Sequence, residues 1–236
     1  MCGIVGIYLK TKKFEKNLGK MLSGMLNNME SRGPDSAGFA IYKNEGSKIY
    51  KFSLCLNNLN FNIFKNQLSK KIKKIKLDQI SDHVILKTKE KPKKIIEIIN
   101  SNFPEVSIVG YGKSIEIFKQ VGNPKDVVKK FKLDEFSGTH GIGHTRMATE
   151  SAITTDGSHP YSTGEDECLV HNGSLSNHNN LRRELTKKGN VFNSENDTEV
   201  AAGYVSHSLS NKKSLKDTLT SGLKDLDGFY TFITGT

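Results

Sequence analysis

The first residues of the chain constrain its fold most strongly. Cys2 follows Met1 directly, and residues 3–9 have the apolar, glycine-containing pattern of a strand that begins at once. Such a strand holds Cys2 inside a fold instead of leaving it on a free terminus. Removal of Met1, expected before a residue as small as cysteine, leaves the thiol beside an α-amino group with a pKa of about 7.7–8.0. One residue then carries both a nucleophile and a general base. Taken alone, Cys2 is better explained as an ordinary second-position cysteine; with the strand that follows it, and before any further motif, the two interpretations are equally good.

Composition excludes several classes of protein. The 236 residues allow one large domain or two small ones. No apolar run approaches the roughly 18 residues of a membrane-spanning helix, so no membrane association is expected. The N-terminus lacks the basic leader and cleavage site of a secretory signal. Three cysteines without metal-site spacing, together with no export signal, favour reduced thiols and a cytoplasmic location.

The net charge of +10 is concentrated in one segment. Residues 43–133 contain 20 lysines and 8 acidic residues, a net charge of +12, whereas the remainder carries −2. Scattered lysines of this kind usually form a solvated face. The segment lacks interleaved aromatic residues and nucleic-acid motifs, so nucleic-acid binding is not expected. The opposite hypothesis, binding through the lysines, predicts affinity that falls steeply with salt.

The chain divides into three blocks. Residues 1–42 predict a strand, an amphipathic helix over about 16–29, a loop at 31–36 and a strand at 37–42. Residues 43–133 read as a small, lysine-rich α/β insert. Residues 134–236 alternate strands, loops and helices and end in an apolar strand at 229–234. That last strand either lies at a sheet edge or indicates a C-terminally incomplete domain; we favour the incomplete domain.

Seven short motifs in the first and third blocks resemble one family, the class II glutamine amidotransferases with an N-terminal cysteine. In chain order the motifs are residues 1–6, 31–38, 143–149, 158–160, 170–173, 177–182 and 194–199. The chain is most similar to the stand-alone amidotransferase subunit of archaeal-type glutamate synthase and of N-methylglutamate synthase. The long insert, the Met147-Ala148-Thr149 continuation after Arg146, and residues 225–232 support that finer resemblance.

The resemblance implies a fold and a domain organisation. The expected fold class is α+β, a four-layer αββα N-terminal nucleophile hydrolase sandwich with a small α/β insert. Residues 1–236 are then one amidotransferase domain, with a core of 1–42 and 134–236 and a lysine-rich insert at 43–133. The strands and amphipathic helices agree with this architecture but would not have identified it alone.

The chemistry of glutamine suggests a role for each residue in these motifs, and the resemblance implies the same roles. Cys2 attacks the side-chain amide, and Asn172 with the Gly173 N–H stabilises the oxyanion. Arg146 offers the planar fork that a carboxylate requires, and the chain has only four arginines. Asp197 suits the α-ammonium group. The resemblance adds Thr149 as a substrate contact, and Arg32 and Asp35 as supports of Cys2.

Several of these residues have ordinary structural interpretations. Arg146 can form a structural ion pair, and Asp197 can cap a helix. Asn172-Gly173 is by itself a strong hairpin-turn signal. His140, His144, His159 and His171 resemble a metal set as a group, but their spacing fits no compact metal motif.

The overall expectation is glutamine hydrolysis to glutamate and ammonia through a γ-glutamyl thioester on Cys2. No cofactor and no metal are expected. The ammonia acceptor is expected to be a separate synthase subunit, of glutamate synthase or N-methylglutamate synthase type. The alternatives are a catalytically silent amidotransferase-like subunit that binds or regulates a synthase, and the amidotransferase domain of another class II enzyme.

Overall fold

A four-stranded antiparallel sheet forms the centre of the molecule. The computed structural model describes residues 2–43, 48–148 and 152–236. In spatial order the strands of this sheet are β1 (Gly3–Tyr8), β8 (His140–Arg146), β2 (Ser36–Tyr42) and β7 (Ile115–Val121). Every residue of β2 is buried, as expected for an inner strand covered on both faces.

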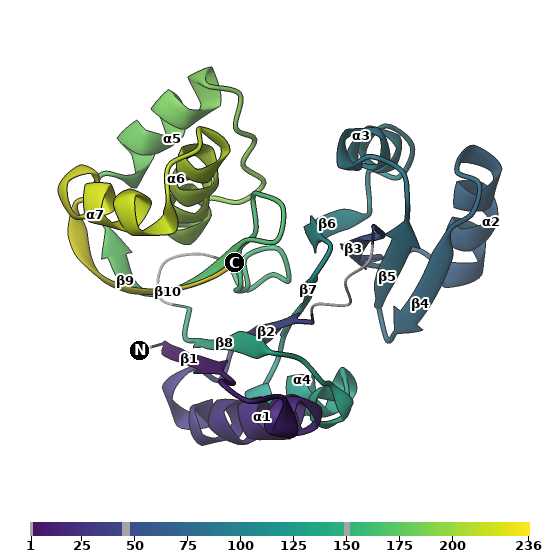
Figure 1. The fold of residues 1–236 in the computed structure, drawn as a ribbon, viewed down its shortest axis with the longest axis horizontal. Helices are drawn as coiled ribbons and strands as arrows, with labels where there is room; N and C mark the ends of the chain where they lie inside the picture. The colour runs from purple at the N-terminus through teal and green to yellow at the C-terminus, as the bar shows by residue number, and fades with distance from the viewer. Residues whose placement is uncertain (1, 44–47, 149–151) are drawn as a thin grey trace.

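Helix α1 (Leu18–Asn28) and helix α4 (Pro124–Lys130) cover one face of this sheet (Figure 1). Leu18, Leu22 and Leu26 lie four residues apart on α1 and are almost fully buried against the sheet. Three 3₁₀ segments border these helices: η1 (Lys12–Asn17), η2 (Glu30–Arg32) and η3 (Leu133–Glu135).

The other face packs on a two-stranded antiparallel sheet of β9 (Cys168–Leu175) and β10 (Gly228–Gly235). Ala40, Ile142 and Val170 belong to the apolar cluster that joins the two sheets. Three helices form the outermost layer: α5 (His178–Lys187), α6 (Asp197–Ser210) and α7 (Leu215–Asp225). The predicted αββα sandwich is therefore confirmed.

A second unit lies beside the sandwich (Figure 1). Its elements follow the order βαββαβ: β3 (Tyr50–Cys55), α2 (Phe61–Lys71), β4 (Lys76–Ile80), β5 (His83–Thr88), α3 (Pro92–Asn102) and β6 (Ser107–Gly112). The sheet order β4-β5-β3-β6, antiparallel throughout, is the ferredoxin-like arrangement. Phe52, Phe64 and Ile99 are among the residues of its own apolar core.

The lysine-rich block and this second unit do not coincide. Strand β7 and helix α4 fall within residues 43–133 but belong to the sandwich, because β7 pairs with β2 and Val127 of α4 packs in the same core as α1. The boundary expected at residue 133 is therefore displaced to the turn between β6 and β7. The lysine-rich composition ends at residue 133, whereas the change from one sheet to the other lies between β6 and β7.

Candidate active site

Cys2 lies at the start of β1, beside the segment that follows β8. Gly3 pairs with Thr145 in the sheet, and the Cys2 Sγ lies 3.9 Å from the carbonyl oxygen of Met147. Arg32 donates from Nε to the Cys2 carbonyl oxygen at 3.3 Å. The strand thus fixes Cys2 next to the Arg146 motif, and Arg32 holds its backbone.

The loop containing Gly33 and Asp35 fits tightly against the same segment. A side chain at Gly33 would place its Cβ 2.4 Å from the carbonyl carbon of Thr145, so only glycine fits there. Asp35 accepts the Ala148 N–H at 2.8 Å and donates its own N–H to the Arg146 carbonyl at 3.0 Å. Asp35 therefore shapes the chain just after Arg146 and contacts Cys2 only through that segment.

Arg146 ends β8 and is almost completely buried. Its guanidinium donates to the carbonyl oxygen of Ala152 at 3.2 Å, across the segment in which Thr149 lies outside the described residues. Buried arginine next to the expected nucleophile is the placement that a carboxylate-binding role requires. The role of Thr149 stays a prediction.

Asn172 and Gly173 lie inside strand β9, not at a turn. They pair with Thr231 and Tyr230 of β10, so the hairpin-turn interpretation is wrong. Gly173 has a φ of +135°, and a Cβ there would lie 2.1 Å from the carbonyl oxygen of Phe229. The positive φ and the close approach of β10 both require glycine at this position.

Asp197 is the first residue of α6, and its neighbour Asn196 is the cap. The Asn196 side chain accepts the Thr198 N–H at 2.9 Å, which corrects the interpretation of Asp197 as the N-cap. Asp197 instead accepts the Leu175 N–H at 2.9 Å and so binds helix α6 to strand β9. Burial alone would raise the pKa of Asp197, but the His171 side chain 3.6 Å away and the hydrogen bond from the Leu175 N–H outweigh burial and lower it.

Arg182 fixes the segment that leads into α6. Its guanidinium donates to the carbonyl oxygens of Ser194 at 2.7 Å and Asn196 at 3.2 Å. These contacts show that Arg182 supports Asp197 through the backbone.

One hydrogen bond connects the two halves of the expected site. His144, two residues before Arg146, donates from Nε2 to the carbonyl oxygen of His171 at 2.8 Å. His171 directly precedes Asn172. The structure thus places Cys2, Arg32, Asp35 and Arg146 at one end of the first sheet, and ties Asn172, Gly173 and Asp197 to it through β9.

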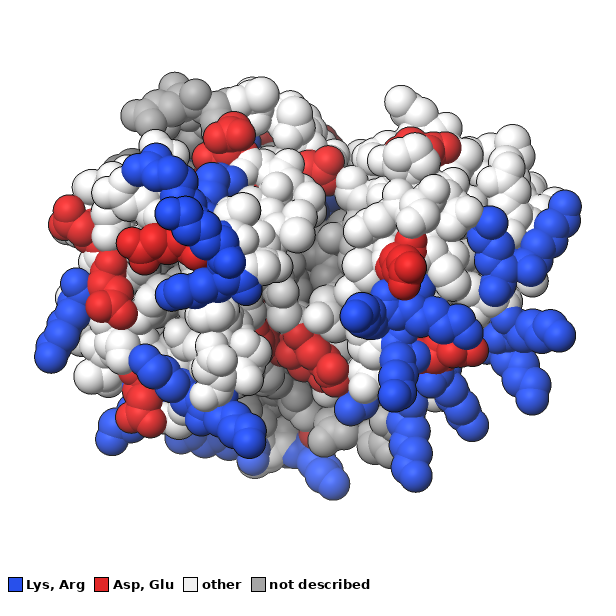
Figure 2. Space-filling view, turned by 90° about the horizontal axis from the view of Figure 1, so that it is seen from above, with Lys and Arg blue, Asp and Glu red and all other residues white. Residues whose placement is uncertain are grey.

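A large cleft lies elsewhere. It measures about 680 Å³ and runs between the second unit and the sandwich, with Phe103 and Tyr111 on one side and Tyr161 and Glu199 on the other. Figure 2 shows the molecule hollowed between two masses, with lysine and arginine side chains spread over both. Among the expected site residues that the structure describes, none lines this cleft.

Lys119 lies buried at the wall of the cleft, and the sequence did not single it out. Its ammonium group donates to the carbonyl oxygens of Asp156 at 3.1 Å and Ser158 at 2.8 Å, and lies 4.5 Å from the centre of the Tyr161 ring. Burial lowers its pKa to about 8. These contacts occupy the ammonium group and hold the loop that follows Arg146.

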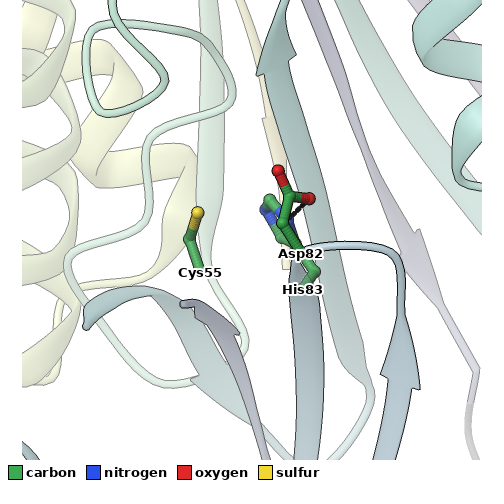
Figure 3. A group of neighbouring side chains, drawn as sticks. All are labelled: Cys55, Asp82 and His83. Carbon is green, nitrogen blue, oxygen red and sulfur yellow. Dashed lines mark hydrogen bonds and ion pairs between the residues drawn. The ribbon is translucent and has the colours of Figure 1, made fainter. Parts of the chain in front are cut away.

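Cys55, Asp82 and His83 form the one group of potential metal ligands found in the described part of the chain (Figure 3). His83 bonds Asp82 at 3.0 Å, and Lys130 and Gln120 donate to the other Asp82 oxygen at 3.1 and 2.8 Å. Burial raises the pKa of the Cys55 thiol to about 11, so a thiolate ligand is disfavoured. A thiol that stays protonated and a carboxylate that already accepts from His83, Lys130 and Gln120 fit a structural cluster better than a metal site.

Comparison with known proteins agrees with this geometry. Residues 134–233 match the family model described as a glutamine amidotransferase domain. The whole chain is 48% identical to the glutamine amidotransferase-like protein GlxB of Rhizobium meliloti, covering 79% of that protein. It is 31% identical over its whole length to a putative glutamine amidotransferase of Methanothermobacter thermautotrophicus, covering 82% of it.

A solved structure shows the same fold. The allosteric regulatory enzyme of purine biosynthesis superposes on 99% of this chain with a TM-score of 0.60 at 19% identity, and the chain spans 35% of that structure. Fold and relatives together define a class II glutamine amidotransferase domain. The chain belongs to the glutamine amidotransferase family, and it is a glutamine amidotransferase enzyme.

In the residues that the structure describes, no helix is both long and apolar enough to cross a membrane.

Proposed function

We propose that the protein hydrolyses glutamine through a γ-glutamyl thioester on Cys2 and passes the ammonia to a separate synthase subunit. The observation that carries the proposal is the placement of the cysteine. Pairing of Gly3 with Thr145 and the bond from Arg32 set its thiol beside the backbone that follows the buried Arg146.

The proposed reaction begins at the N-terminus. With Met1 removed, the free α-amino group of Cys2 takes the thiol proton, and the sulfur attacks the side-chain amide carbon of glutamine. Asn172 and the Gly173 N–H stabilise the oxyanion, and the proton passes to the departing ammonia. Water then hydrolyses the thioester, which releases glutamate and regenerates the thiol.

The substrate is held by its amino-acid head group in this proposal. Arg146 pairs with the α-carboxylate and Asp197 with the α-ammonium. Asp35 and Arg182 set these two side chains through backbone contacts. Thr149 is retained as a further substrate contact.

A separate ammonia acceptor is supported by the size of the relatives. The chain covers 79% and 82% of two relatives whose names describe only an amidotransferase, which leaves about a fifth of each unmatched. A synthase of the glutamate or N-methylglutamate type is the acceptor that we propose. Adding the synthase encoded by a neighbouring gene should convert free ammonia release into product amination; unchanged ammonia release would exclude that pairing.

The test of the thioester uses the three cysteines as mutual controls. Cys2→Ala should abolish ammonia release and labelling by an electrophilic glutamine analogue, while circular dichroism stays unchanged. Cys55→Ala and Cys168→Ala, both at buried positions, should keep labelling at Cys2. Mass spectrometry that finds the label on Cys55 or Cys168 would contradict the mechanism, and a folded wild-type protein without turnover would favour the silent-subunit alternative.

A further inference from the structure

Two buried histidines meet at one threonine hydroxyl between the two sheets and α6, and a third histidine packs against them. His159 Nε2 lies 2.8 Å and His171 Nδ1 lies 2.9 Å from the Oγ1 of Thr198, which is itself fully buried. The ring of His144 stacks on that of His159 with centroids 3.8 Å apart. The mechanism proposed above uses none of these four side chains.

Hydrogen positions in the cluster follow from counting donors and acceptors. His144 must carry its proton on Nε2, because a carbonyl oxygen only accepts. A threonine hydroxyl can accept two hydrogen bonds and donate one. It accepts from His159 Nε2 and His171 Nδ1 and donates to Asp197 Oδ1, 3.4 Å away.

The buried ring atoms without partners support this assignment. They are Nδ1 of His144, Nδ1 of His159 and Nε2 of His171. These are the three nitrogens that the assignment leaves without a proton. Any other arrangement of neutral rings would leave a buried N–H without an acceptor, which is rarer in proteins than an unused acceptor.

An imidazolium would place a proton on one of these partnerless nitrogens, so the contacts assign a neutral ring to each histidine. The donors of His159 and His171 reach Asp197 through the Thr198 hydroxyl. Burial lowers the pKa of His144 to about 3 and that of His159 well below its usual range. Among the described residues, no lysine or arginine forms an ion pair with Asp197. Its oxygens receive N–H and O–H groups from Leu175 and Thr198, with His171 Nδ1 at 3.6 Å.

We propose that Thr198, His159, His171 and His144 are positioning residues that hold Asp197 as an ionised carboxylate without a counter-ion, ready for the α-ammonium group of glutamine. Neutral donors stabilise the negative charge without cancelling it, so the strongest available partner is an incoming cation. His144 also fixes the His171 carbonyl, and so the backbone next to Asn172. The proposal deepens the role of Asp197 and rests on the function proposed above.

Nuclear magnetic resonance tests the network without any turnover. In protein labelled with ¹⁵N-histidine, two-bond ¹H–¹⁵N correlations distinguish the two neutral tautomers from imidazolium. At pH 7 we expect Nε2–H for His144 and His159, and Nδ1–H for His171. An imidazolium at any of the three, or the opposite tautomer at His159 or His171, would overturn the proposal even if the enzyme hydrolyses glutamine.

Kinetics test whether the network serves the ammonium group. Thr198→Val, which keeps the shape and loses the hydroxyl, should raise the KM for glutamine about tenfold or more with kcat nearly unchanged. The effect should vanish with 4-carbamoylbutanoate, which lacks the α-amino group. Thr198→Ser should restore the KM.

Thr218→Val is the matched control. Thr218 is equally buried, but its hydroxyl has no partner, so the same substitution should leave KM unchanged. Equal losses on both substrates, or a serine variant as poor as valine, would show a merely structural role and overturn the proposal. If Thr198→Val does not fold, the histidine spectra decide. A wild-type protein that releases no ammonia would instead contradict the proposed function and leave the spectral test in force.

Discussion

Within the described residues, two histidine–aspartate pairs have buried histidines: His83 with Asp82 in the second unit and His171 with Asp197 in the sandwich. The side chains of the two histidines are 0% and 3% exposed, and those of the aspartates 24% and 20%. Asp82 also accepts from the ammonium group of Lys130 at 3.1 Å, whereas the described contacts of Asp197 come from a backbone N–H and side chains that we infer to be neutral. At similar burial, Asp82 thus forms an ion pair with a lysine of the protein, whereas Asp197 is a carboxylate without a protein counter-ion.

The comparison indicates what separates a structural carboxylate from a binding one. Position along the chain does not distinguish the two aspartates, because each lies at or next to the end of a helix or strand. The difference is the presence of a cation on the protein. A carboxylate that already pairs with Lys130 gains little free energy from a cationic ligand. A carboxylate held by neutral donors gains its counter-ion from such a ligand.

The largest effect on activity is expected at Asn172. Asn57, whose amide oxygen accepts from the Cys55 thiol, serves as the comparison. Asn172→Ala should lower kcat by about 10²–10³, the usual cost of one lost oxyanion donor, with little change in KM. Asn57→Ala should leave both constants unchanged. Steady-state ammonia release measures the pair. A large rise in KM at unchanged kcat would instead make Asn172 a ground-state binder.

The two aspartates give the next contrast. Asp197→Asn should lower kcat/KM for glutamine by about 10²-fold, mainly through KM, because the ammonium group loses its charged partner. Asp82→Asn should leave kcat/KM unchanged. If both variants lost activity equally, the distinction between carboxylates with and without a protein counter-ion would be wrong.

The smallest expected effect is on stability and concerns Asp82 alone. Burial would raise its pKa, but hydrogen bonds from His83 and Lys130 outweigh burial and lower the pKa to about 2. A lowered carboxyl pKa stabilises the fold above the unfolded-state pKa, near 3.8, and this stability is lost as the pH falls through about 2. Solvent near the partly exposed group reduces the contribution to about 1 kcal/mol.

Asp82→Asn should therefore lower the free energy of unfolding at pH 7, with a difference from the wild type that shrinks below about pH 4. Urea unfolding at pH 7, 4 and 3 measures it. A difference that grew on acidification would contradict the sign of the shift.

The sequence predicted local features better than those that depend on distant partners. The i, i+4 spacing of leucines predicted helix α1, and the apolar run after Cys2 predicted β1, because each pattern lies within a few residues. The resemblance supplied the sandwich. The boundary of the insert was misplaced because only pairing with β2 shows that β7 belongs to the first sheet.

The site divides in the same way. The motifs indicated Cys2, Arg146 and Asp197, whose roles follow from their chemistry and stay predictions. Local rules misread Asn172-Gly173 as a turn and Asp197 as a cap, because β10 and Asn196 decide those conformations. Thr198 was missed, since nothing in its own neighbourhood shows that two histidines 39 and 27 residues away meet its hydroxyl.

The pairing of β2 with β7 has a consequence for how the chain tolerates rebuilding. Tyr42 and Ile115 are directly opposite in the ladder, so the whole second unit occupies the place of a hairpin loop. Chain-closure entropy grows only logarithmically with loop length, so a domain-sized excursion costs little more than a long loop. A designed two-residue turn from Tyr42 to Ile115 would be sterically simple, yet it would strip Ile85, Cys55 and Val109 from the sandwich's apolar clusters. The strand order would therefore allow the ferredoxin-like unit to be removed, but the packing of the sandwich would not. A minimal version of this enzyme would need polar residues on the surface that the removal exposes.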